Sequence, residues 1–115
     1  MKTLIKCLLI SVNLMVYTSC SSQINNSKTV KTKIYGNCGM CKKTIDEAGS
    51  ETNISQVNWD IENKFAVITY DSSATNLSTI LKKIASSGYD NELFYAPKKS
   101  YKKLHECCKY ERKIK

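Results

Sequence analysis

The sequence lacks an apolar segment long enough to cross a bilayer, and it contains only one proline. Its apolar N-terminal segment falls short of the roughly 20 residues that a membrane-spanning helix requires. The single proline, Pro97, marks the end of the section that we expect to fold. Between Cys20 and Ala96 the chain also lacks net charge, because eight lysines balance eight acidic residues. The 115 residues therefore predict at most one domain and no transmembrane helix.

The net charge of +8 is concentrated at the ends of the chain. Residues 97–115 contain eight basic and two acidic side chains, a net charge of +6. A basic tail can contact nucleic acid, anionic lipid or an acidic protein. Because the N-terminus indicates export, we expect no nucleic-acid partner.

Residues 1–19 have the pattern of an export signal. Lys2 and Lys6 precede a short apolar segment at residues 8–16, and small residues lead to Cys20. This resembles a bacterial lipoprotein signal, in which the cysteine becomes the lipidated first residue. We expect residues 20–28 to be the lipidated N-terminus and a polar tether, with plain secretion as the alternative. The expected location is a bacterial cell envelope, at the outer membrane or facing the periplasm.

The hydrophobic pattern from residue 29 onward predicts a β-α-β-β-α-β order. Period-two alternation or high β propensity predicts strands at 29–35, 54–60, 64–70 and 89–95. Helical periodicity predicts helices at 41–49 and 77–85. This order predicts a ferredoxin-like α+β fold, an antiparallel sheet with both helices on one face. A thin stripe of Tyr101, Leu104 and Cys108 predicts a basic C-terminal helix within 97–115, with little apolar surface for docking.

Cys38 and Cys41 form a C-x-x-C pair between the first strand and the first helix. A disulfide across so short a loop restrains little of the chain, so such pairs more often have a chemical role. A helix N-terminus and nearby lysines favour the thiolate, which is the form that binds metal. Two thiolates suit Cu(I), whereas a structural zinc site requires four protein ligands.

The element order and the segment Tyr35-Gly36-Asn37-Cys38-Gly39-Met40-Cys41 together resemble the heavy-metal-associated domain family, over residues 29–96. The family motif is Gly-Met-x-Cys-x-x-Cys. Both cysteines match, while Gly36 stands in place of the motif methionine and Met40 lies between the cysteines. Gly88-Tyr89 matches a Gly-Tyr pair of bacterial members. The resemblance implies that Tyr89 lies beside the metal, and we expect Met40 there too.

The resemblance implies metal binding through Cys38 and Cys41 without catalytic turnover. Cu(I) is the expected ion, with Hg(II), Ag(I), Zn(II) and Cd(II) as alternatives. An incoming thiolate from a partner would take the under-coordinated ion by ligand exchange. The expected partner is a metal-transport protein or another metal-binding domain with an acidic docking face, which Lys42 and Lys43 would orient.

Two other interpretations of the pair remain open. A thiol–disulfide oxidoreductase would use the same cysteines, since thioredoxin-like proteins also place C-x-x-C at a helix start. A thioredoxin-like site would require a proline in the loop that faces its cysteines. The only proline of this chain, Pro97, instead follows the last predicted strand. The other interpretation is a structural disulfide in an interaction domain.

The tail contains a second group of potential ligands in His105-Glu106-Cys107-Cys108. On a helix, His105 and Cys108 share a face and could reach one ion. The group would form a second metal site or a relay to Cys38 and Cys41. Equally, the two tail thiols could form a disulfide, with His105 solvated.

Overall fold

The computed structural model describes residues 24–113. The predicted export signal and Cys20 lie outside these residues, so lipidation and location stay predictions. Among the described residues, no helix combines the length and the apolar character that crossing a membrane demands.

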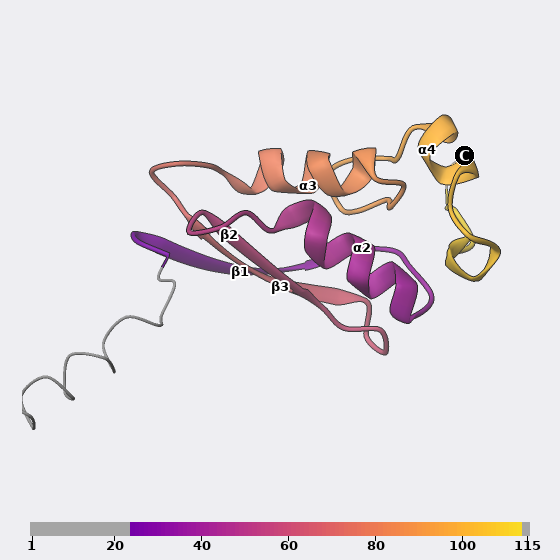
Figure 1. Ribbon diagram of the computed structural model, residues 1–115, viewed down its shortest axis with the longest axis horizontal. Coiled ribbons are helices and arrows are strands. Elements are labelled where there is room, and N and C mark those ends of the chain that lie inside the picture. The colour runs from indigo at the N-terminus through magenta and orange to yellow at the C-terminus, as the bar shows by residue number, and fades with distance from the viewer. Residues whose placement is uncertain (1–23, 114–115) are drawn as a thin grey trace, which may run out of the picture.

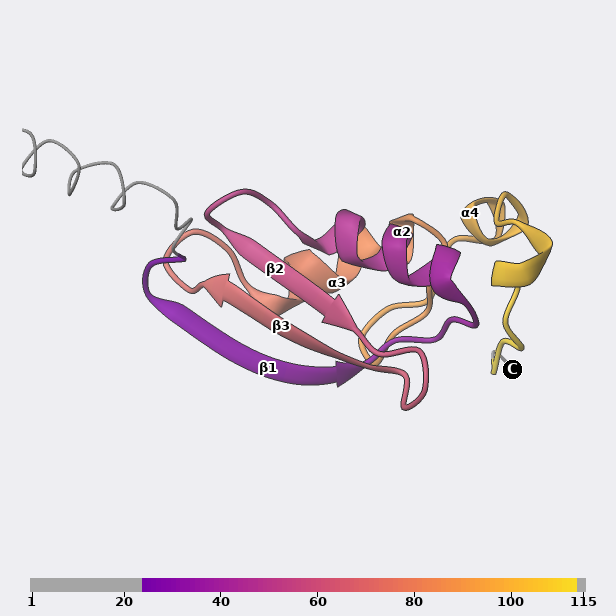
Figure 2. The same ribbon diagram turned by 60° about the horizontal axis from the view of Figure 1, so that its bottom comes forward.

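Three antiparallel strands form the sheet, in the order β1-β3-β2 (Figure 2). The strands are β1 (Ser27–Lys33), β2 (Ser55–Trp59) and β3 (Phe65–Asp71). In β3, Ala66, Ile68 and Tyr70 alternate inward, as the period of two requires. Ile68 pairs with Val30 of β1 and Val57 of β2, so one apolar row crosses the whole sheet. This buried face determines the register of both neighbouring strands.

Two helices, α2 (Gly39–Gly49) and α3 (Leu77–Ser86), cover one face of the sheet (Figure 1). Both helices were predicted within two residues of their observed ends. Helix α3 begins at Asn76, whose side-chain oxygen accepts a hydrogen bond from the Thr79 N–H at 2.8 Å. The buried residues of α3 recur at helical spacing: Ile80, Leu81, Ile84 and Ala85.

Helix α2 packs closely against both β2 and α3. Its buried residues are Cys41, Ile45 and Gly49, one turn apart along a single face. A Cβ at Gly49 would lie 2.9 Å from Ile84 Cδ1, so only glycine allows this approach. The face that carries Cys41 is therefore held against the core, which positions the start of the helix.

The predicted fourth strand at 89–95 is not formed. Only an isolated bridge between Ile34 and Asn91 and the hydrogen bond from Tyr35 N to Asp90 O, 2.9 Å, follow the edge of β1. The Asn91 side-chain oxygen instead accepts from the backbone N–H groups of Leu93 and Phe94, both at 3.1 Å. Such side-chain bonds to nearby backbone compete with a β ladder, and here they turn the chain away.

The predicted continuous C-terminal helix is also not formed. The tail contains a short helix, α4 (Lys98–Lys102), and a 3-10 helix, η2 (Glu106–Cys108). Figure 1 shows both near the start of α2, to which η2 comes close. The expectation that this tail has little surface to dock with was therefore wrong, because Cys108 and Tyr110 are buried in the core.

Candidate metal-binding site

Cys38 and Cys41 lie at the start of α2, as predicted. Cys38 is the N-cap residue with extended backbone, and Cys41 occupies the first turn. Their sulfur atoms are 3.4 Å apart. Cys41 is fully buried, and its sulfur accepts the Asn37 backbone N–H at 3.4 Å, while Cys38 is half-buried. The pair thus has one fixed inner thiol and one thiol that faces the surface.

The environment of Cys38 favours its thiolate. Burial opposes ionisation, but the backbone N–H of Cys41 and the thiols of Cys108, Cys107 and Cys41 outweigh it and lower the pKa of Cys38 to about 6. The N-terminus of α2 adds a favourable partial positive charge. Near neutral pH Cys38 is therefore ready to bind a soft cation without first losing a proton.

Trp59 forms the floor beneath the loop. Its ring N–H donates to Ile34 O at 2.9 Å and to Lys64 O at 3.2 Å, which fixes the indole in the core. A Cβ at Gly36 would lie 2.9 Å from Trp59 Cη2 and 3.3 Å from Cys41 Cβ. No larger side chain fits at residue 36 without movement, because the Trp59 ring packs directly beneath the loop.

The tail brings Cys107 and Cys108 to the same place. The sulfur of Cys38 lies 3.4 Å from the sulfur of each. The sulfur atoms of Cys38, Cys41 and Cys108 all lie within 4.8 Å of one another. Cys107 is exposed, and its sulfur is as close to Cys38 as that of Cys108 and 3.9 Å from that of Cys108, but only Cys108 is grouped with both loop thiols. The structure thus places the tail thiols beside the C-x-x-C pair, as the alternative of a relay to Cys38 and Cys41 expected, and whether these residues bind a metal stays a prediction.

Met40, Tyr89 and His105 surround this cluster without joining it. The Met40 sulfur is 3.7 Å from the Cys107 sulfur, and Met40 is half exposed. Tyr89 is buried, and desolvation together with the thiols of Cys108 and Cys41 raises its pKa. His105 precedes η2 and is exposed, so it does not share a helical face with Cys108 as expected.

The lysines after Cys41 differ in their availability. The Lys42 ammonium donates to Asp46 Oδ2, Asn58 Oδ1 and the Trp59 carbonyl, at 2.8, 2.8 and 2.9 Å. These bonds use all three of its donors and tie α2 to the end of β2. Lys43 is exposed, and it makes no ion pair within residues 24–113. Of the two, Lys43 is the one whose ammonium is not used in contacts with the described residues.

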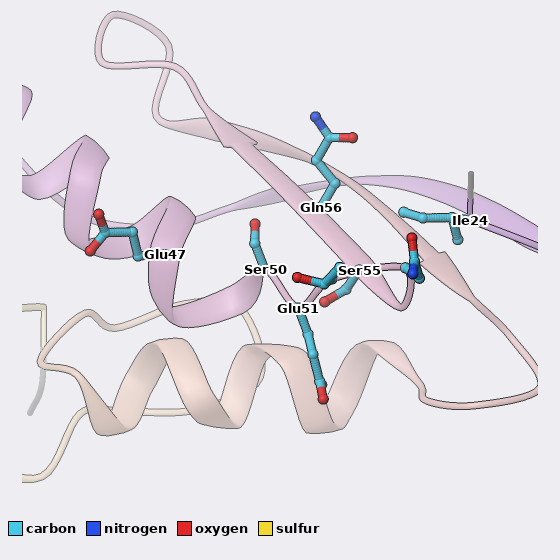
Figure 3. Close-up of a pocket in the computed structure, with 8 residues that line it drawn as sticks. Ile24, Glu47, Ser50, Glu51, Ser55 and Gln56 are labelled. Atoms are coloured by element: carbon cyan, nitrogen blue, oxygen red, sulfur yellow. The ribbon is translucent and has the colours of Figure 1, made fainter. Parts of the chain in front are cut away.

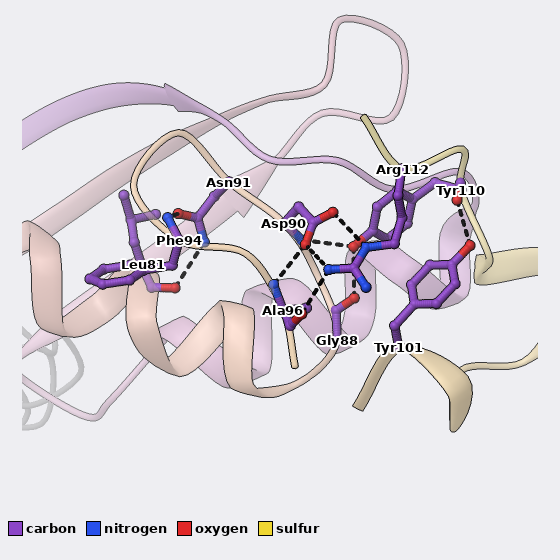
Figure 4. Close-up of polar contacts among 9 residues, drawn as sticks. All are labelled: Leu81, Gly88, Asp90, Asn91, Phe94, Ala96, Tyr101, Tyr110 and Arg112. Carbon is purple, nitrogen blue, oxygen red and sulfur yellow. Dashed lines mark hydrogen bonds and ion pairs between the residues drawn. The ribbon is translucent and has the colours of Figure 1, made fainter. Parts of the chain in front are cut away.

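The tail is anchored just after its cysteines, where Tyr110 and Arg112 bond to Asp90 (Figure 4). Arg112 forms two hydrogen bonds to the Asp90 carboxylate, at 2.9 and 2.7 Å, and a third to Ala96 O at 2.7 Å. The Tyr110 hydroxyl donates to Gly88 O and accepts from the Asp90 N–H, both at 2.8 Å. Sequence patterns missed these residues, because about 20 residues separate the partners and no periodicity connects them.

A separate hollow of about 440 Å³ lies at the other end of α2, near the turn that leads into β2 (Figure 3). It is lined mainly by polar side chains, including Glu47, Ser50 and Glu51. Among the described residues the thiol cluster is the one group whose side chains converge tightly enough for a metal ion. The hollow offers no comparable convergence of ligands.

Comparison with known protein families agrees with this geometry. Residues 37–90, which contain both cysteines of the loop, match the profile of the heavy-metal-associated domain family. This segment, a little under half of the chain, is similar to a heavy-metal-associated domain. The matched residues end at Asp90, so the tail with Cys107 and Cys108 lies beyond the family domain. No curated protein sequence gives a significant match to the chain.

Two solved structures resemble this part of the chain. A CopZ metallochaperone superposes with a TM-score of 0.52 at 24% identity, covering 56% of this chain and 98% of its own. A Bacillus anthracis str. Ames protein whose name assigns it copper-ion binding gives 0.55 at 28% identity, covering 59% and 99%. The first shows the shared fold. In both, nearly the whole relative corresponds to little more than half of this chain.

Proposed function

We propose that this protein binds a soft heavy-metal ion, Cu(I) in the first place, through Cys38 and Cys41 and passes it on by thiolate exchange. The observation that carries the proposal is the pair of sulfur atoms 3.4 Å apart at the start of α2. Soft thiolates select Cu(I), and this pair lies in the segment that matches the heavy-metal-associated domain model. The copper-related name of one structural relative supports the choice of ion.

Transfer follows from the unequal burial of the two thiols. Cys41 is buried and fixed, whereas Cys38 is partly exposed, so an incoming partner thiolate can approach the ion from the side of Cys38. The new metal–sulfur bond forms as the bond to Cys38 breaks, and the oxidation state of the ion stays the same. The exposed ammonium of Lys43 would help to orient an acidic surface of the partner.

Anaerobic competition titration with Cu(I) tests this proposal. Cys38→Ser and Cys41→Ser should each weaken Cu(I) binding strongly and leave the far-ultraviolet circular dichroism spectrum unchanged. Tight binding at the level of the wild type in either variant would contradict the proposal. An insulin-reduction assay on the same samples separates the oxidoreductase alternative, for which thiol-dependent turnover is the expected result.

We also propose that the protein acts in the cell envelope, held to a membrane by a lipid on Cys20. The support is the signal-like pattern of residues 1–19 and the polar tether that follows. Cys20→Ala should move the protein from the membrane fraction to the soluble fraction. A variant that stays with the membrane would rule out this anchor.

A further inference from the structure

The tail places a buried thiol directly against the two thiols of the C-x-x-C loop. Cys108 is only 2% exposed, and its sulfur is 3.4 Å from that of Cys38, a residue 70 positions earlier in the chain. A buried cysteine often serves only as a small apolar side chain. Here the sulfur of Cys108 instead converges with the sulfurs of Cys38 and Cys41, all within 4.8 Å of one another.

The position of Cys108 is fixed by contacts on both sides of it. Before it, Leu104 packs against Gly88, where the backbone has a φ of +117° and a Cβ would lie 2.8 Å from Leu104 Cδ2. After it, the Tyr110 ring stacks on Tyr89 at 6.1 Å and its hydroxyl bonds the backbone of Gly88 and Asp90. The ion pair between the buried Asp90 and the partly buried Arg112 lies at the end of the segment (Figure 4).

The contacts that hold the tail in place do not involve the sulfur atoms of the cluster. The Tyr101 hydroxyl donates to Tyr110 O at 2.6 Å, and the Arg112 guanidinium lies 4.9 Å over the Tyr101 ring. A thiol carried by an unattached tail would approach the loop only part of the time. Cys108 is preorganised, so a metal ion that binds it need not order the tail first.

The spacing of the sulfurs suits three ligands around one ion. With metal–sulfur bonds of about 2.3 Å, the sulfurs of a thiolate site lie roughly 3.8 to 4 Å apart, slightly farther than the 3.4 Å seen between Cys38 and its neighbours. Small side-chain movements would therefore admit an ion between them. Cys107 is equally near Cys38 and 3.9 Å from Cys108, but it is exposed beside Met40, and only Cys108 is grouped with both loop thiols.

We propose that Cys108 is a third thiolate ligand, which makes the site a three-sulfur site for a soft ion such as Cu(I), with Cys107 left free at its rim. This inference rests on the proposed function, because it adds one ligand to Cys38 and Cys41. A third sulfur shields the ion from solvent and binds it more firmly than the loop alone. An acceptor must then displace Cys108 as well as the loop thiols.

X-ray absorption spectroscopy of the Cu(I)-loaded full chain counts the sulfur ligands. Cys7→Ser and Cys20→Ser are present in every sample, so that only the four described thiols remain. We expect three sulfurs in the parent protein, two in Cys108→Ser, and three in Cys107→Ser, the matched control that removes the adjacent thiol. Competition titration should show that Cys108→Ser weakens Cu(I) binding by roughly tenfold or more, while Cys107→Ser changes it little.

Several outcomes would overturn the inference. Two sulfurs in the parent protein, with tight one-to-one Cu(I) binding, would remove Cys108 from the site and leave the proposed function intact. A third sulfur that is present only in a dimer, or that disappears in Cys107→Ser instead, would assign the ligand elsewhere. A parent protein that retains no Cu(I) would defeat both the inference and the proposed function.

A second variant keeps the test valid if Cys108→Ser does not fold. Arg112→Leu removes the bonds to Asp90 and Ala96 but retains all four thiols. Because Cys108 depends on this anchor for its position, the sulfur count should fall toward two and Cu(I) binding should weaken. Three sulfurs and unchanged affinity in Arg112→Leu would contradict the role given to the docked tail.

Discussion

The two pairs of cysteines reach the same point by different means. Cys38 and Cys41 are neighbours in sequence, and the cap and first turn of α2 are enough to bring their sulfurs to 3.4 Å. Cys107 and Cys108 lie on a tail beyond the family domain, and long-range contacts bring them to the loop. Each pair has one buried and one more exposed thiol: Cys41 and Cys108 are buried, and Cys38 and Cys107 are more accessible.

The geometry of the loop pair is specified by a local sequence motif, whereas the geometry of the tail pair depends on contacts between distant parts of the fold. The geometry of the loop pair should survive changes far from α2. The position of the tail pair depends on Asp90, Tyr110 and Arg112, whose interactions depend in turn on the loop after α3. The two pairs can therefore be disturbed separately, and each substitution below is chosen to affect one of them.

The largest effect is expected for Asp90→Ala, which breaks the anchor of the tail pair. It leaves the partly buried Arg112 guanidinium without its carboxylate and the Ala96 N–H without its acceptor. Removing one partner of a buried ion pair costs about 3 kcal/mol, measured here by urea denaturation in the presence of a reductant. Alkylation followed by mass spectrometry should show Cys108 exposed and Cys41 still protected.

The matched control is Glu111→Ala, which removes an exposed carboxylate next to the same anchor. It should change the free energy of unfolding by less than about 0.5 kcal/mol. If Cys108 stays as protected in Asp90→Ala as in the wild type, the ion pair does not hold the tail.

Gly36→Ala disturbs the loop pair, Cys38 and Cys41, and not the tail pair. The added Cβ would lie 2.9 Å from the Trp59 ring and 3.3 Å from Cys41 Cβ, so the loop must shift. Overpacking of this kind costs about 2 kcal/mol, and Cu(I) binding should weaken with it. Gly39→Ala is the control, since a Cβ there meets no atom within 4 Å and helix propensity favours alanine. Equal destabilisation in both variants would show that packing against Trp59 is not the cause.

Tyr110→Phe weakens the anchor of the tail more gently. The ring remains to stack on Tyr89, but Gly88 O loses its donor and the Asp90 N–H loses its acceptor. Leaving these buried backbone groups unpaired costs about 1.5 kcal/mol of unfolding free energy by urea denaturation. Tyr95→Phe, which removes an exposed hydroxyl, should have no measurable effect. Equal stability of the two variants would exclude the hydroxyl as an anchor.

The contrast between the two pairs also marks how far the sequence could predict the structure. The strands and helices up to residue 86 follow strong periodicity, and the C-x-x-C pair was located because its spacing and its place before a helix are local signals. The predicted fourth strand failed because Asn91 bonds the backbone of Leu93 and Phe94. The sequence pattern of residues 89–95 does not reveal that the Asn91 side chain competes with strand pairing for these backbone groups.

The docked tail could not be predicted in the same way. Tyr101, Leu104 and Cys108 were recognised as an apolar stripe, and all three do contact the core. Their position depends on the pairing of Asp90 with Arg112, a contact between residues 22 apart that no repeating pattern encodes. The prediction of a relay between the tail thiols and the loop came closest, because it allowed the four sulfurs to meet.

The smallest effect is expected for Asn76→Ala, which removes the cap of α3 and leaves both thiol pairs in place. The Thr79 N–H loses its side-chain acceptor, and the loss of such a cap costs about 1 kcal/mol. Urea denaturation measures this loss, and Cu(I) affinity and the protection of Cys108 should stay at wild-type values. This variant separates general destabilisation from effects on the site. If Asn76→Ala also weakened Cu(I) binding, reduced stability alone would explain part of the losses expected in the other variants.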